Sequence, residues 1–177
     1  MINHRPESIA SIPEFLAHAL ELEYESADRY RELAGNMEVH NNPEISQLFL
    51  YLARMSDLHA MEVEERAQGI ALPQIPPWDF KWSAGGSPEA NAAEQDEELN
   101  YLMTPIQALH LALHNEIRGR DFYAQVAAGS PDAKVRQLAA TMVEEENEHA
   151  ALLEERLAKL DPARSEPVED LDPPNMP

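Results

Sequence analysis

The sequence predicts an all-α protein, an antiparallel four-helix bundle built from two helical hairpins. Apolar residues recur at helical spacing in four long segments, the second pair of segments repeats the first, and a long connection separates the pairs. With 177 residues the chain suits one domain with a buried core of its own. We expect the bundle to span residues 1–162, with the connection at about 70–103, and a proline-rich acidic tail to occupy residues 163–177.

Helix-capping residues bound the first hairpin. Its first helix is predicted to begin with a capping box at residues 11–14, with proline in the first turn, and to end near Gly35. One acid, Glu23, interrupts the apolar stripe of this helix. The second helix is predicted to begin at Asn42-Pro43 by the same logic and to end at Gly69.

The connection is too long for a tight turn, so the helices that it joins can lie parallel, whereas the short links within each pair force antiparallel hairpins. Its prolines exclude a helix from the first half. We expect Trp78, Phe80 and Trp82 to pack on the bundle surface or on a second subunit; a ligand site is the alternative. A short helix is predicted over residues 87–103.

The second hairpin follows the same rules. A capping box at residues 104–107 begins its first helix, which ends at Gly129 and carries one acid, Glu116, on its apolar face. The last helix is predicted to begin at Ser130-Pro131 and to end at Asp161-Pro162.

The last helix also carries Glu146 and His149. These residues stand three apart, so a carboxylate and an imidazole project from the same apolar face, one turn along. Burying both without a partner costs several kcal/mol, and the simplest partner for the two together is a metal ion.

The internal repeat adds further residues to this pair. At one fixed spacing His59-Ala60 matches His149-Ala150, and at a similar spacing Glu23 matches Glu116. Helix lengths then place all the matched side chains near mid-bundle, in one layer. Three carboxylates in such a layer repel one another unless cations or protons are bound, which predicts a metal site. The expected ligands are Glu23, His59, Glu116, Glu146 and His149.

These residues make the chain resemble the rubrerythrin branch of the ferritin-like superfamily. The pattern of ferritin-like di-iron proteins is one Glu from each of two helices and a Glu-x-x-His from each of the other two. The resemblance implies that Glu23 and Glu116 are the lone glutamates, that Glu146 with His149 is one complete motif, and that His59 belongs to the other. It also implies a ferritin-like bundle holding iron, as two ions or one, with zinc or manganese as alternatives.

The chain departs from the family pattern in three places. Ser56 stands where the second Glu-x-x-His has its glutamate, Gly119 leaves no second glutamate one turn after Glu116, and the rubredoxin-like cysteine module is absent. Glu62, one turn beyond His59, is an alternative carboxylate. Because the cysteine module is absent, electrons for a redox reaction would come from an external donor.

Other polar residues have two interpretations each. Tyr30 and Tyr123 lie on the faces of Glu23 and Glu116, either as plain core aromatics or with hydroxyls that hydrogen-bond the metal-binding glutamates; Ser56 is a further supporting residue. His110 and His114 lie off the Glu116 stripe and are expected on a solvated or interface face.

Composition narrows the function classes. The absence of cysteine excludes disulfides, iron–sulfur clusters and cysteine-ligated zinc. A net charge of -20 argues against nucleic acid and anionic membranes as partners. With no signal-like start and no bilayer-length apolar run, we expect a cytoplasmic protein, and from the resemblance a homodimer.

Three hypotheses about function stay open. The first is an oxidoreductase, a di-metal protein that reduces peroxide, reacts with dioxygen or oxidises Fe(II), as a rubrerythrin-like peroxidase or ferroxidase. The second is a redox-silent metal-binding or structural protein with an incomplete site, which Ser56 favours. The third is a helical interaction domain that needs no metal.

Overall fold

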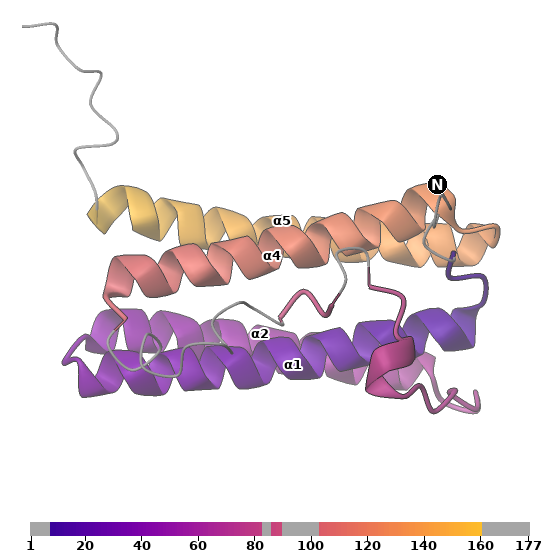
Figure 1. The fold of residues 1–177 in the computed structure, drawn as a ribbon, viewed down its shortest axis with the longest axis horizontal. Coiled ribbons are helices and arrows are strands. Elements are labelled where there is room, and N and C mark those ends of the chain that lie inside the picture. Colours follow the sequence, from indigo (N-terminus) through magenta and orange to yellow (C-terminus); the bar gives the residue numbers. More distant parts are fainter. Residues whose placement is uncertain (1–7, 83–85, 90–102, 161–177) are drawn as a thin grey trace, which may run out of the picture.

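The computed structural model describes residues 8–82, 86–89 and 103–160, and its long helices form two hairpins (Figure 1). Helix α1 spans Ile12–Val39 and packs along α2, Pro43–Arg66; helix α4 spans Pro105–Gly129 and packs along α5, Ala133–Leu160. A short 3-10 helix, η1, at Pro77–Asp79 lies in the connection. The predicted fold class, an all-α ferritin-like bundle of two hairpins with a long connection, is confirmed.

The predicted caps hold the helix starts. The Ser11 hydroxyl accepts a hydrogen bond from the Glu14 amide at 3.4 Å, while the Glu14 carboxylate accepts from the Ala10 amide at 3.2 Å. At the start of α4, Thr104 and Gln107 form the complete capping box, each side chain accepting from the other residue's backbone amide. Such caps stabilise a helix start by roughly 1 kcal/mol each.

Helix α1 is longer than predicted, ending at Val39 rather than near Gly35. The additional turn buries Met37 completely, and a fully buried methionine stabilises the fold by roughly 1.5–3 kcal/mol. This gain exceeds the cost of glycine inside a helix, about 1 kcal/mol. Asn41, in the left-handed region at φ 54°, then turns the chain into α2.

Helix α5 begins later than predicted, at Ala133 rather than at Ser130-Pro131. Asp132 caps the start of this helix, because its carboxylate accepts hydrogen bonds from the backbone amides of Lys134 at 2.8 Å and Val135 at 3.4 Å.

The connection is fastened to α1 by a buried histidine. The rings of Phe80 and Trp82 stack with their centroids 5.1 Å apart, and both contact His18. His18 donates from Nδ1 to the Glu14 carbonyl and accepts at Nε2 from the Lys81 amide, each at 2.9 Å. Phe80 and Trp82 therefore pack on the bundle as predicted.

Trp78 differs from its two neighbours, because 81% of its surface is exposed in this chain. The predicted helix over residues 87–103 falls mostly on residues 90–102, which lie outside the described residues, as does the tail at 163–177. Ser87 and Glu89 are described and lie in an irregular, buried stretch.

Two apolar clusters make up the core, one toward each end of the bundle. The first includes Tyr30, Met37, Phe49, Leu52 and Leu109. The second includes Phe15, Leu22, Phe122, Val126 and Val135. On every long helix the predicted metal-binding positions lie between the residues of one cluster and those of the other, so the polar layer is at mid-bundle.

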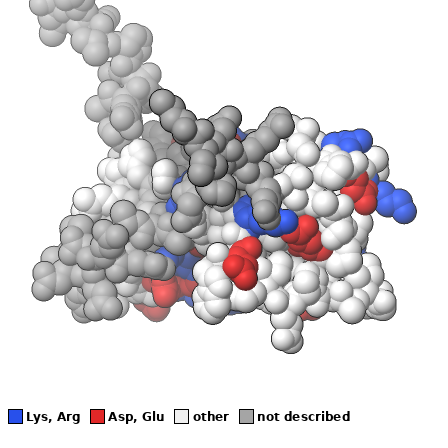
Figure 2. All heavy atoms as spheres, turned by 45° about the vertical axis from the view of Figure 1, so that its right-hand side comes forward, with Lys and Arg blue, Asp and Glu red and all other residues white. Residues whose placement is uncertain are grey.

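The described surface carries charges of both signs. On the face drawn in Figure 2, Lys and Arg side chains lie beside Asp and Glu side chains rather than in one patch. None of the helices in the described ranges has both the length and the apolar character that crossing a bilayer requires.

Candidate metal centre

Helices α4 and α5 bring three of the predicted ligands into one group, which we call the α4/α5 group: Glu116, Glu146 and His149. All three side chains are buried, and each offers a ligand atom within 4.8 Å of those of the other two. His149 Nδ1 lies 3.3 Å from Glu116 Oε2 and 4.0 Å from Glu146 Oε2. Two carboxylate oxygens and an imidazole nitrogen make a donor set for iron, zinc or manganese.

Two features of this group fit a bound cation. The buried Oε2 of Glu116 accepts no hydrogen bond within the described residues, although an unsatisfied buried acceptor costs roughly 1–3 kcal/mol. A Cβ atom at Gly119 would lie 3.3 Å from Glu146 Oε1, so the absence of a side chain there makes room for this carboxylate. Gly119, which departs from the family pattern in sequence, thus has a local role beside Glu146.

Glu23 and His59 lie together on the other hairpin. His59 Nδ1 is 3.8 Å from Glu23 Oε2 and 3.9 Å from Oε2 of Glu145, a residue of α5. We call Glu23, His59 and Glu145 the His59 group. The ring centroids of His59 and His149 are 5.2 Å apart and the rings are stacked, so the two groups adjoin. The structure therefore brings all five predicted residues together in one layer, whereas metal binding by them stays a prediction.

Two tyrosines join the hairpins through the glutamates. Tyr30 of α1 donates a hydrogen bond to Glu116 Oε1 on α4, and Tyr123 of α4 donates to Glu23 Oε1 on α1 at 3.4 Å. Both rings also pack in the core. Of the two interpretations of these tyrosines, the structure supports hydroxyls that orient the carboxylates across the hairpin interface.

Ser56 is buried on α2, one turn before His59. Its hydroxyl donates a hydrogen bond to the Ser26 hydroxyl on α1 at 3.2 Å. The predicted supporting role of Ser56 toward the metal site has no contact among the described residues to carry it. Glu62, the alternative carboxylate, is 55% exposed and lies 3.9 Å from Arg66 Nη2.

Burial and neighbouring charges shift the ionisation of the α4/α5 group. Burial raises the pKa of Glu146 well above its usual range, and the adjacent Glu116 carboxylate adds to the rise. Burial opposes ionisation of Glu116 as well, but its polar neighbours Glu146, His149 and Tyr30 outweigh burial and lower the pKa. Burial lowers the pKa of His149, yet Glu116 raises it by more. A cation binding at this group would therefore compete with a proton for the Glu146 carboxylate.

The pKa values of His59 and Glu145 are also shifted. Burial lowers the pKa of His59, but the nearby carboxylates of Glu23 and Glu145 give a net rise. Burial raises the pKa of Glu145.

Glu89 of the connection is a further buried acid beside the centre, and no pattern in the sequence predicted it. Burial and the charge of Glu116 raise its pKa to about 8. Asn115, the residue before Glu116, donates a hydrogen bond from Nδ2 to the Glu89 carboxylate at 2.8 Å.

Glu145 was not among the predicted ligands, although it directly precedes Glu146 in the sequence. Helical periodicity turns successive residues by about 100°, which favours one inward residue of such a pair. His110 and His114 are exposed, as predicted.

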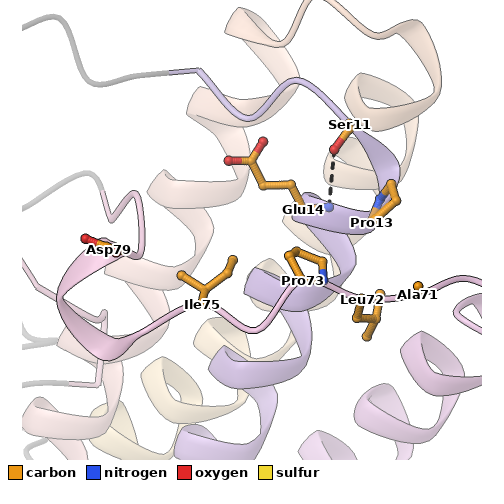
Figure 3. A pocket seen from close by; sticks show the side chains of 8 residues that line it. All are labelled: Ser11, Pro13, Glu14, Ala71, Leu72, Pro73, Ile75 and Asp79. Atoms are coloured by element: carbon orange, nitrogen blue, oxygen red, sulfur yellow. Dashed lines mark hydrogen bonds between the residues drawn. The ribbon is translucent and has the colours of Figure 1, made fainter.

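A groove of about 590 Å³ lies at the start of α1, lined by the helix and the connection (Figure 3). Its lining includes Ser11, Glu14, Leu72 and Asp79, and none of the predicted ligands. It is therefore separate from the candidate metal centre.

The chain is similar to a protein-family model and to a protein of known crystal structure. The family model described as Rubrerythrin matches residues 14–76, which include Glu23 and His59. A crystal structure of an uncharacterized conserved protein from Magnetospirillum magnetotacticum MS-1 is similar, with 41% sequence identity and a TM-score of 0.72. That similarity covers 84% of this chain and 95% of the other. No curated protein matches the chain significantly.

Proposed function

Because the chain belongs to the rubrerythrin family of ferritin-like proteins, we propose that it is a di-iron redox protein. Its substrates are peroxide, dioxygen or Fe(II), and the α4/α5 group and the His59 group hold the metal.

The observation that carries this proposal is the buried α4/α5 group. Glu116, Glu146 and His149 converge in an interior layer, and Glu116 Oε2 has no hydrogen-bond donor among the described residues. Two carboxylates this close cannot both be ionised without a positive partner. A divalent cation satisfies the free oxygen and both charges at once.

When bound, iron supplies the electron-transfer chemistry toward peroxide, dioxygen or Fe(II). The side chains have distinct tasks around it. Glu116, Glu146 and His149 would bind the metal. Tyr30 holds Glu116 in place by donating a hydrogen bond to its Oε1. The Glu146 carboxylate, whose pKa is raised by burial, would have to be deprotonated to hold the metal, so binding would tighten with rising pH. The apolar clusters at both ends exclude water from the layer.

The first test is iron content after anaerobic loading with Fe(II) and removal of excess. The proposal expects about two irons per chain, with loss of metal in Glu146→Ala. Glu148→Ala is the matched control, because Glu148 is exposed on the same helix and should leave the iron content unchanged. Peroxide consumption and Fe(II) oxidation are then measured on the loaded protein. Rates no higher than those of buffer would refute the redox part of the proposal.

A second candidate function, a redox-silent metal-binding protein, is favoured by Ser56. Because this residue is a serine, helix α2 offers no carboxylate at this position, and the hydroxyl donates a hydrogen bond to Ser26. In this case Ser56→Glu creates an oxidase activity that the natural protein lacks. An unchanged, absent activity in the variant would count against the second candidate.

Two partners belong to the proposal. For reduction of peroxide or dioxygen without Fe(II) as the reductant, an external electron donor is needed, because the sequence has no cysteine with which to hold a rubredoxin-like centre. A homodimer is supported by the exposed apolar residues Leu50, Leu58 and Met61 on α2. Light scattering coupled to size exclusion measures the assembly directly, and a monomer at micromolar concentration would refute the dimer.

A further inference from the structure

We propose that Glu145 supplies the carboxylate that Ser56 lacks, so that Glu23, His59 and Glu145 form the second metal position. This inference rests on the proposed metal-binding function and names the ligand set of its less complete half.

The geometry around His59 is the first argument. His59 Nδ1 lies 3.8 Å from Glu23 Oε2 and 3.9 Å from Glu145 Oε2. A zinc-sized ion about 2.1 Å from each of two ligand atoms can join atoms up to ~4.2 Å apart. Both separations are within that span, so one ion can bind His59 with either carboxylate. To bind the ion together, the two carboxylates must move closer to each other, because among the described residues it is the α4/α5 group whose three ligand atoms all lie within 4.8 Å of one another.

The other acids near His59 are less suitable. Glu62 is 55% exposed and lies 3.9 Å from Arg66, whereas Glu145 is 25% exposed and lies by the imidazole. Ser56 has no charge, and its hydroxyl is used by Ser26.

The donor count is the second argument. Ferritin-like di-iron sites use four glutamates and two histidines, one Glu on each of two helices and a Glu-x-x-His on each of the other two. With Ser56 in place of glutamate, this chain retains Glu23, Glu116 and Glu146. Glu145 restores the fourth carboxylate in the same layer, beside the histidine that lost its partner on α2.

The internal repeat shows how the two helices differ at these positions. At the spacing that matches His59 to His149, the pair Met55-Ser56 corresponds to Glu145-Glu146. Helix α2 therefore has no acid at either position, and α5 has one at both. Glu146 serves the α4/α5 group while Glu145 extends toward His59.

The experiment counts Co(II) ions, a redox-stable probe, bound per chain by elemental analysis and by visible absorption titration. We expect about two ions in the natural protein and about one in Glu145→Gln, which keeps the side-chain size and removes the charge. Glu144→Gln is the matched control, because Glu144 is the exposed neighbour on the same helix, and it is expected to bind about two.

A second variant guards against a fold defect in Glu145→Gln. Glu145→Asp keeps the charge on a shorter side chain, so it should retain about two ions with weaker binding of one. Circular dichroism of each metal-free variant checks that the helices are intact.

The outcomes separate this inference from the function on which it rests. Two ions in both the natural protein and Glu145→Gln would overturn the role of Glu145. A single ion in the natural protein, lost in His149→Ala and unaffected by Glu145→Gln, would also overturn it while leaving metal binding in place. No bound Co(II) in the natural protein would remove the proposed function itself.

Discussion

The α1/α2 and α4/α5 hairpins repeat each other in sequence but contribute unequally to the centre of the bundle. Each hairpin provides one glutamate from its first helix and one histidine from its second. Only α5 adds further carboxylates, at the two positions that α2 fills with Met55 and Ser56. The histidines and the glutamates of the first helices are thus arranged symmetrically, whereas the additional acids both come from α5.

The two groups also differ in burial. The side chains of Glu116, Glu146 and His149 are 2%, 11% and 6% exposed, while Glu145 in the His59 group is 25% exposed. Charges interact more strongly where water is excluded. The comparison teaches that two polar groups in one bundle layer can differ in their access to water, and we expect the drier α4/α5 group to bind a cation more tightly than the His59 group.

Removing one histidine at a time is the strongest way to break this comparison. His149→Ala is expected to weaken metal binding at the α4/α5 group by at least the 10–100-fold that loss of supporting residues costs elsewhere. His59→Ala should leave that tight binding step intact and abolish the weaker one. Isothermal titration with Zn(II) resolves the two steps. Equal losses in the two variants would contradict the difference between the groups.

Removing the tyrosine hydroxyls compares the same groups without metal. Tyr30→Phe leaves Glu116 Oε1 without its donor beside an Oε2 that already lacks one, so we expect a loss of about 1.5–3 kcal/mol in unfolding free energy. Tyr123→Phe removes a longer bond of 3.4 Å and should cost less, about 0.5–1.5 kcal/mol. Urea unfolding of the metal-free variants at pH 7 measures both. A larger loss for Tyr123→Phe would reverse the predicted order.

Raising the pH is expected to act in opposite directions on the metal-free and metal-bound protein. The folded-state pKa of Glu146 and that of His149 lie above the ordinary values of 4.5 and 6.5, and that of Glu89 is about 8. The folded protein therefore binds more protons than the unfolded chain, and its stability falls as pH rises through these values. Glu116, with a lowered pKa, acts oppositely, but only at acidic pH.

With Zn(II) bound, the trend reverses, because the metal needs deprotonated ligands and binds more tightly as pH rises. Each unit of pKa difference is worth about 1.4 kcal/mol, so urea unfolding at pH values from about 6 to 9 resolves the slopes. Slopes of the same sign with chelator and with Zn(II) would argue against metal binding by these acids.

The smallest effect is expected from a methyl group at Gly119. In Gly119→Ala the new Cβ lies 3.3 Å from Glu146 Oε1, so this carboxylate must shift and metal affinity should fall by roughly tenfold. Gly35→Ala is the control on α1, where nothing lies within 4 Å, and it should stabilise the protein by about 0.4–1 kcal/mol with unchanged affinity. Unchanged affinity in both variants would mean that Gly119 has no part in placing Glu146.

The sequence alone predicted the four long helices, the caps at Ser11 and Thr104 and the five residues of the polar layer, whereas the end of α1 and the start of α5 differ from the prediction. Thr104 and Gln107 identify a helix start because their reciprocal bonds need only four consecutive residues. Glu23, His59 and Glu116 could be placed at one depth because the rise per residue is fixed and the hairpins repeat. These features depend on local geometry, which the order of residues specifies.

The tertiary structure decided which side chains meet across the hairpins. Helical periodicity sets the direction of a side chain from its own axis, but the helix that it faces depends on how the two hairpins pack. Tyr30 therefore donates a hydrogen bond to Glu116 rather than to Glu23. Ser56 donates one to Ser26, and Glu145 lies beside His59. Close packing of the two hairpins, rather than any single segment, brings a fourth carboxylate into the layer.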